Sequence, residues 1–110
     1  ASPGDRHLLG TIVSRSAMRP EPDVHITISN PRQFDAVTRD RDPLPLYVRG
    51  VLSTSRSDPL SVAVVVNGIV AAITQSYRER NEHMFGTLIP ETALRDGHNT
   101  VAAFVVRTEG

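Results

Sequence analysis

The side chains that could carry out chemistry in this chain of 110 residues are few and lie far apart in the sequence. Its histidines, His7, His25, His83 and His98, form neither an HxH nor an HExxH pattern. A zinc site requires several ligands that converge on one ion. We therefore expect no metal site, with His25 and His83 facing solvent from strands and His98 lying in a turn.

Asp40 and Asp42 have the Asp-x-Asp spacing with which calcium loops bring alternate carboxylate oxygens to one cation. Here Arg39 and Arg41 alternate with the two acids, and no glycine is present to allow the sharp bend of such loops. Because the arginines would compete with a cation for the carboxylates, we interpret this segment as a solvated loop with local ion pairs.

The sequence also lacks the usual signatures of a nucleophile or a phosphate site. It contains no cysteine, no lysine and no Gly-x-Ser-x-Gly motif, and its seven glycines stand apart from one another. Twelve acidic residues balance twelve arginines, so the chain has no net charge and no basic footprint for nucleic acid. We expect no catalytic residue, no cofactor and no nucleic-acid partner.

The two tyrosines, Tyr47 and Tyr77, are the candidates for contact with a ligand. Exposed aromatic rings serve as platforms on which sugars stack, and their polar ends tolerate water. The chain has few aromatic residues and no tryptophan, so ordinary packing of both tyrosines within the fold is the competing interpretation.

The elements that would position these residues are strands, and the clearest of them form a hairpin over residues 60–75. Its two β-branched runs are joined by Asn67-Gly68, the pair that most readily adopts the positive φ angles of a type I′ turn. A two-residue loop predicts three cross-strand pairs that face a core together: Val66 with Ile69, Val64 with Ala71, and Val62 with Ile73.

Alternation of apolar and polar residues indicates further strands, over residues 23–29, 45–54, 83–89 and 99–107. We expect a charged connection over residues 77–82 and at most one helical turn over residues 90–94, with Gly97 suited to its C-cap. This spacing predicts an all-β fold, an Ig-like antiparallel β-sandwich of about seven strands. Residues 1–22 are interpreted as a linker with an edge strand at 8–13, and residues 23–110 as the sandwich domain.

Some of these strands are apolar on both faces, which is unusual where one face of an antiparallel sheet meets water. The second face of the hairpin carries Val65 and Val70, and the last strand has apolar residues at successive positions. Such a face is either covered by the 1–22 linker or the 90–97 turn, or it docks onto another domain or subunit. Val65 and Val70 are therefore candidate interface residues.

One set of turn and core residues resembles a known family. A Val-Asn-Gly hairpin at 66–68 is followed by Phe-x-x-Leu-Ile-Pro at 85–90 and by Leu-Arg-Asp-Gly-His-Asn-Thr-Val at 94–101. This arrangement resembles a recurrent bacterial Ig-like domain. More narrowly, it is similar to the C-terminal Ig-like β-domain of actinobacterial membrane-anchored sulfatase-like proteins of the alkaline-phosphatase superfamily. The likeness covers residues 44–106, and the all-arginine composition agrees with such a source.

The resemblance implies a domain outside the membrane that belongs to a hydrolase of sulfate or phosphate esters. The chain begins Ala-Ser-Pro-Gly-Asp without a methionine, which also suggests an excised fragment. Sulfatases require a Cys or Ser in a C/S-x-P-x-R motif, and the segment Ser-Asp-Pro-Leu-Ser at 57–61 lacks that arginine. The resemblance therefore carries over no catalytic residue.

We expect this chain to be a non-catalytic accessory domain that packs against the catalytic domain of a larger membrane-anchored sulfatase-like hydrolase. The alternative is a glycan- or protein-binding module of the cell envelope. By the resemblance, the domain would lie outside the cytoplasm at the cell surface, with no membrane contact of its own. Its partner contacts would come from Tyr47, Tyr77, Val65 or Val70. A free-standing enzyme would instead need a deep polar pocket that joins His25 or His83 to a carboxylate.

Overall fold

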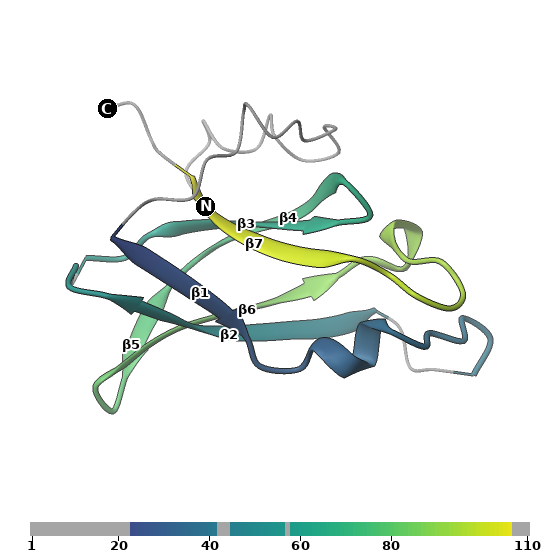
Figure 1. Ribbon diagram of the computed structural model, residues 1–110, viewed down its shortest axis with the longest axis horizontal. Helices are drawn as coiled ribbons and strands as arrows, with labels where there is room; N and C mark the ends of the chain where they lie inside the picture. Colours follow the sequence, from purple (N-terminus) through teal and green to yellow (C-terminus); the bar gives the residue numbers. More distant parts are fainter. Residues whose placement is uncertain (1–22, 42–44, 57, 107–110) are drawn as a thin grey trace.

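The computed structural model describes residues 23–41, 45–56 and 58–106 of the chain. The predicted linker at 1–22, with its edge strand at 8–13, lies outside these residues. Two short 3-10 helices, η2 (Pro31–Phe34) and η3 (Glu91–Ala93), lie in connections between strands. The strands are shown in Figure 1: β1 (Val24–Ile28), β2 (Leu46–Thr54), β3 (Ser61–Val66), β4 (Ile69–Gln75), β5 (Tyr77–Glu79), β6 (Glu82–Ile89) and β7 (Val101–Val106).

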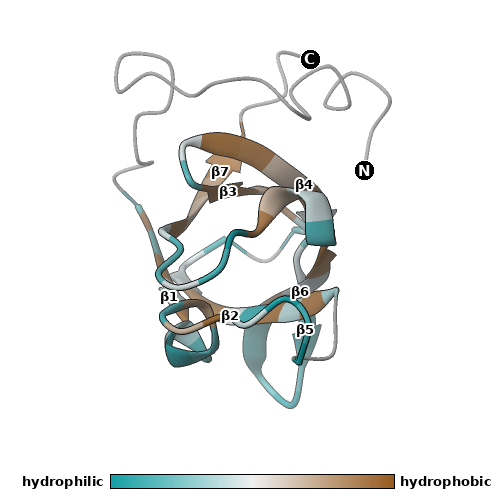
Figure 2. Cartoon of the chain, turned by 90° about the vertical axis from the view of Figure 1, so that its right-hand side faces the viewer, coloured by the Kyte–Doolittle hydropathy of each residue, from teal (hydrophilic) through white to brown (hydrophobic). Residues whose placement is uncertain are grey.

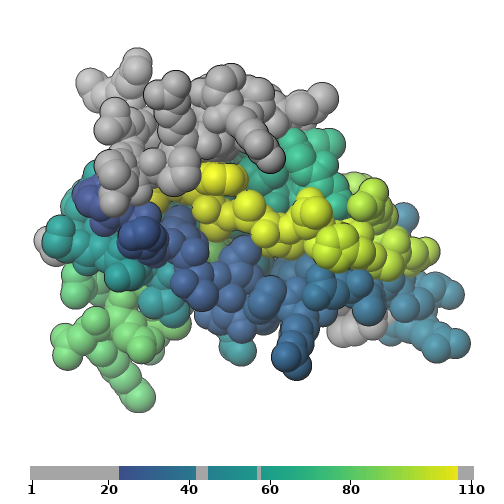
Figure 3. Space-filling model, viewed as in Figure 1, coloured from purple at the N-terminus to yellow at the C-terminus, as the bar shows by residue number. Residues whose placement is uncertain are grey.

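The strands form two antiparallel sheets that pack face to face, as the view in Figure 2 shows. One sheet has the order β1-β2-β6-β5, and the other has the order β4-β3-β7. Strand β1 packs beside β7 of the opposite sheet, and Figure 3 shows the two next to each other on one side of the molecule. The predicted all-β antiparallel sandwich is confirmed.

The core lies between the two sheets and is filled by alternate residues of the strands. The largest fully buried side chains that form it are as follows: Phe34, Val48, Val62, Val64, Val66, Phe85 and Ile89. A side chain at Gly50 in β2 would collide with the Phe85 ring and with the Thr27 carbonyl oxygen. Because Gly50 has none, the Phe85 ring packs directly against the backbone of β2.

The hairpin of β3 and β4 begins as predicted and then departs from the predicted register. Asn67 and Gly68 have φ angles of 53° and 81°, and the first pair, Val66 with Ile69, is confirmed. A bulge between Val64 and Val65 shifts the register by one residue, so the other two predicted pairs are wrong. Beyond the bulge the pairs are Val64 with Ala72, Ala63 with Ile73, and Val62 with Thr74.

The bulge changes which side chains of β4 face the core. Ala72 is buried in the core, whereas Ile73, which was predicted to face the core, packs on the opposite face of the sheet. Thr74 turns toward β6 instead, where its hydroxyl lies 3.5 Å from the Gly86 carbonyl oxygen. The reason is that one extra residue inverts every later position of a strand with a period of two.

Residues 77–82, which were predicted to be a charged connection, instead contain a short strand and the start of the next one. Tyr77–Glu79 forms the short edge strand β5, which pairs with the start of β6. The two-residue turn between them is Arg80-Asn81, and both residues have positive φ angles, of 50° and 67°. The turn lacks glycine and all three β5 residues are exposed, so neither turn chemistry nor alternation indicated a hairpin.

Asn99 lies between η3 and β7 and is a buried polar residue, 2% exposed. Its Oδ1 accepts hydrogen bonds from the Arg95 backbone N–H at 2.9 Å and from Asn67 Nδ2 at 2.8 Å. Its Nδ2 donates to the carbonyl oxygens of Phe34, Arg95 and Gly97, at 3.3, 2.9 and 3.2 Å. The Asn99 amide therefore joins η2, the β3–β4 turn and the loop before β7.

We predict that Gly68→Val destabilises the domain, although a side chain at Gly68 would meet no atom within 4 Å. The cost comes from the backbone, because a β-branched residue at positive φ is strained by about 1–2 kcal/mol. Urea unfolding monitored by circular dichroism measures it. Gly68→Asn is the matched control, since asparagine tolerates this conformation. Equal stability of the valine and asparagine variants would contradict the turn.

Candidate functional site

The residues with reactive side chains are dispersed over the described part of the chain. In residues 23–41, 45–56 and 58–106, no three His, Asp or Glu side chains lie close enough to hold a metal ion. His98 Nδ1 lies 3.1 Å from Asp35 Oδ1 at the surface, and His25 is exposed on β1 as predicted. His7 and Asp42 fall outside the described residues, so the predicted Asp40–Asp42 loop is described only through Arg41.

The prediction that His83 faces solvent is wrong. Its side chain lies inside the sandwich and the residue is 4% exposed, next to Ser76, which is 3% exposed. Ser76 Oγ and His83 Nε2 are 2.6 Å apart. A serine beside an imidazole is the arrangement of an activated nucleophile, so this pair is a chemical candidate, within the described part of the chain, that we did not predict from the sequence.

The surroundings of the pair indicate a structural role. Ser76 Oγ accepts the Leu60 backbone N–H at 2.8 Å, and the Ser76 N–H donates to the Leu60 carbonyl oxygen at 2.8 Å. The hydroxyl therefore fixes the start of β3 to the junction of β4 and β5. His83 Nδ1 is buried without a hydrogen-bond partner in the described part of the chain. Both side chains are thus enclosed by the fold.

The buried position also lowers the pKa of His83. The first cause is the loss of hydration on burial, which disfavours the imidazolium, and the nearby Arg78 guanidinium acts in the same direction. Asp58 opposes both by attracting a positive charge. The fold therefore favours neutral His83.

We predict that the free energy of unfolding falls as the pH is lowered through about 6.5, where histidine in the unfolded chain begins to bind a proton. The folded state binds that proton only at lower pH, because the His83 pKa is lowered. Urea unfolding at pH 7.5 and pH 5 measures the difference. His83→Gln should reduce this difference, whereas His25→Gln, at an exposed position, should retain it. An unchanged difference in His83→Gln would contradict the prediction.

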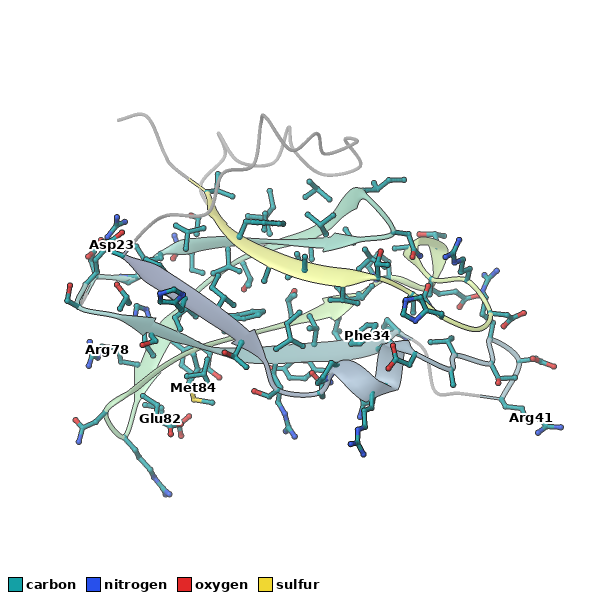
Figure 4. All side chains as sticks on the ribbon, in the orientation of Figure 1. Asp23, Phe34, Arg41, Arg78, Glu82 and Met84 are labelled. Atoms are coloured by element: carbon teal, nitrogen blue, oxygen red, sulfur yellow. The ribbon has the colours of Figure 1, made fainter. Side chains whose placement is uncertain are left out.

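Both candidate tyrosines lie on the outer face of the four-stranded sheet. Tyr47 in β2 is 46% exposed and Tyr77 in β5 is 43% exposed. In the register, Tyr47 is opposite Leu88, which is 56% exposed, and Tyr77 is opposite Met84. Figure 4 shows Met84 pointing away from the sandwich. We call this surface the tyrosine face and define it by these residues: Tyr47, Arg49, Val51, Tyr77, Met84, Gly86 and Leu88.

The Tyr47 side chain is held in place by its neighbours. It lies across Gly86, where any side chain would collide with the Tyr47 hydroxyl. The backbone beneath it is fixed by Asn30, whose Nδ2 donates to the Tyr47 carbonyl oxygen at 2.7 Å and whose Oδ1 accepts the Arg49 N–H at 3.2 Å. The ring is thus ordered and accessible, which lowers the entropy lost when a partner binds it.

The valine candidates occupy the other side of the molecule. Val65 and Val70 are paired in β3 and β4 and lie on the outer face of the three-stranded sheet. Both are buried, at 7% and 1% exposed. The structure therefore brings the two valines together as a pair, whereas the two tyrosines share the opposite side of the molecule, on β2 and β5 with β6 between them, and are exposed.

No family model, curated protein or solved structure matches this chain. The described residues contain no helix that is both long and apolar enough to cross a bilayer. The choice of a candidate site therefore depends on this structure alone. Of the predicted contact residues, the exposed ones lie on the tyrosine face.

Proposed function

We propose that this chain is a non-catalytic accessory domain that binds another protein through the tyrosine face. The observation that carries the proposal is the exposed Tyr47–Leu88 pair. Large apolar side chains gathered on one sheet face lose contact with water when a partner covers them, and this favours binding. Among the described residues, the buried pair with nucleophilic potential, Ser76 and His83, is enclosed by the fold, and Ser76 is engaged by the Leu60 backbone.

The composition of the tyrosine face supports a protein partner. Tyrosine and methionine are enriched in the centres of protein interfaces, and ordered aromatic rings often dominate the binding energy. Val51 and Met84 are half-buried and paired with each other, so they extend the apolar surface between the two tyrosines. Glu82 is exposed and lies at the end of this surface, which suits a polar rim, whereas the exposed Arg49 lies within it, between Tyr47 and Val51 on β2.

The proposed partner is the catalytic domain of a membrane-anchored sulfatase-like hydrolase outside the cytoplasm. What supports this finer proposal is the resemblance described above, whose residues have defined structural roles. Asn67 and Gly68 form the β3–β4 turn, Phe85 lies in the core, and Asn99 is the buried amide. These roles support a shared domain type and, through it, a shared parent protein.

A glycan- or protein-binding module of the cell envelope is the second candidate. The observation that favours it is the presence of two exposed tyrosines on one sheet face. Tyrosine presents an apolar ring with a polar end, which fits the apolar face and the hydroxyl edge of a sugar.

Binding to each partner class tests the proposal. We expect an isotopically labelled chain, titrated with the catalytic domain of an actinobacterial sulfatase-like protein, to show NMR shift changes centred on β2 and β6. The double variant Tyr47→Ala/Leu88→Ser should raise Kd at least about tenfold, as expected when a central interface contact is lost. Ile69→Ser is the matched control, because Ile69 is 42% exposed but lies at the β3–β4 turn.

The same chain titrated with purified envelope polysaccharides separates the two candidates. The glycan-binding module would be favoured if the chain binds a polysaccharide but not the catalytic domain. In that case Tyr47→Ala or Tyr77→Ala should abolish binding of the polysaccharide. Shift changes that remain in the Tyr47→Ala/Leu88→Ser variant, or that spread over other surfaces, would contradict the tyrosine face as the site.

A further inference from the structure

The hairpin of β5 and β6 continues from β4 at a bend of the chain. Strand β4 ends at Gln75 and β5 begins at Tyr77, so the chain passes from the three-stranded sheet to the four-stranded sheet at Ser76. Strand β5 has three residues, lies at the edge of its sheet and leads into a turn that projects from one end of the molecule (Figure 1). The place of Tyr77 on the tyrosine face therefore depends on how firmly this short strand is held.

The outer half of the hairpin adds little to its stability. Glu79 lies opposite Glu82, and like charges directly opposite each other in a sheet are destabilising. Both turn residues, Arg80 and Asn81, have positive φ angles, and this conformation costs free energy for the arginine in particular. The hairpin therefore depends on the contacts at its other end, next to β4.

At that end, the Ser76–His83 hydrogen bond links the hairpin to the opposite sheet. Ser76 Oγ lies 2.6 Å from His83 Nε2 in β6, and the same oxygen accepts the Leu60 backbone N–H at 2.8 Å. The Ser76 backbone N–H donates to the Leu60 carbonyl oxygen at 2.8 Å. One serine thus connects β6 to the residue that precedes β3, and His83 is the hairpin's contribution to this link.

This arrangement accommodates neutral His83 but not its protonated form. An imidazolium carries N–H groups on both ring nitrogens. The Nε2 proton can be donated to Ser76 Oγ, whereas Nδ1 is buried and has no hydrogen-bond partner in the described part of the chain. A buried charged donor without an acceptor is costly. Both N–H groups would be hydrated if the hairpin moved away and the ring reached water, so protonation favours an open hairpin.

The charged groups around His83 act in the same sense on balance. Burial lowers the pKa of His83 most, the Arg78 guanidinium lowers it further, and Asp58 in the β2–β3 connection raises it. Arg78 lies directly opposite His83 in the β5–β6 register, and the opposite residue on β2 is the uncharged Leu52. The other titratable groups at this end of the sandwich are as follows: His25, exposed on β1; Asp23 and Arg56, hydrogen-bonded to each other; and Glu79 and Glu82, on the outer side of the hairpin.

We propose that protonation of His83 releases the β5–β6 hairpin, so that acid pH removes Tyr77 from the tyrosine face and weakens binding there. Tyr47 and Leu88 remain in place, because they lie on β2 and on the part of β6 that is not paired with β5. The effect grows as the pH falls below about 6.5, where a histidine in water binds a proton. The release concerns this chain alone, whereas its consequence for a partner rests on the proposed function.

Amide hydrogen exchange of the free full chain, measured by NMR and corrected for the pH dependence of the intrinsic rate, tests the release. Between pH 7.5 and pH 5, protection of the amides at 77–79 and 82–84 should fall at least about threefold more than that of β3 and β7. One proton on an exposed histidine sets a limit of about thirtyfold. NOEs between the paired residues Tyr77 and Met84 should weaken over the same range. An equal loss of protection in all strands, or no loss, would overturn the proposal.

Two arginine variants and a histidine variant identify the group that titrates. His83→Gln, which binds no proton, should keep the protection of the hairpin constant, and a fall that persists in it would overturn the proposal. If His83→Gln does not fold, Arg78→Gln decides. It removes an exposed charge opposite His83, which eases protonation of the closed hairpin, so the fall should be smaller. Arg32→Gln, exposed in η2, is the matched control and should show the full fall. Equal falls in the two arginine variants would then overturn the proposal.

Titration of the labelled chain with the sulfatase-like catalytic domain at pH 7.5 and pH 5 measures the effect on binding. We expect a higher Kd at pH 5, with shift changes lost at Tyr77 and retained at Tyr47. Tyr77→Ala is the control for titration of the partner itself, and its Kd should change less between the two pH values. If the hairpin opens but the catalytic domain binds at neither pH, the proposed function is wrong and the release stands. If the hairpin opens and Kd is the same at both pH values, the regulation of binding is overturned.

Discussion

The Asn99 amide constrains the end of the sandwich where three otherwise separate connections meet. Its oxygen and nitrogen are both hydrogen-bonded, to Asn67 in the hairpin turn, to the Phe34 carbonyl oxygen in η2, and to its own loop. Asn67 in turn binds both backbone polar groups of Thr100, at 2.9 and 3.1 Å. Because burying an amide is favourable only when its groups are paired, this network permits one arrangement of the turn, η2 and β7.

That arrangement determines which side chains of the domain are enclosed and which are exposed. With β7 fixed beside β1 and β3, the two sheets enclose an apolar core, and Ser76 and His83 are enclosed with it. The same closure directs Tyr47 and Leu88 outward from β2 and β6. The domain therefore exposes apolar side chains on the outer face of one sheet while it keeps Ser76 and His83 away from solvent.

Local patterns in the sequence predicted the features that depend on neighbouring residues. The alternation in β1 and β2 and the Asn67-Gly68 turn follow from a period of two and from φ preference. No local pattern predicts the bulge in the β3–β4 hairpin. Because of it, Ile73 lies on the face of the sheet opposite the one that we predicted. We predicted that His83 faces solvent, although it stands two residues before the buried Phe85 and so shares its side of the strand; its bond to Ser76 depends on a contact between strands that no local pattern specifies. The Tyr47–Leu88 pair likewise requires the β2–β6 register, which no local pattern specifies.

The most direct measurement is the free energy of unfolding of Asn99→Ala, compared with that of Asn30→Ala. Both asparagines bond to backbone groups, but Asn99 is 2% exposed whereas the hydrogen bonds of Asn30 lie at the surface. Removing the Asn99 amide leaves several buried donors and acceptors unpaired, at about 1–3 kcal/mol for each such group. We predict a loss of at least about 3 kcal/mol for Asn99→Ala and about 1 kcal/mol for Asn30→Ala. Equal losses, or a loss below about 1 kcal/mol for Asn99→Ala, would contradict the central role of this network.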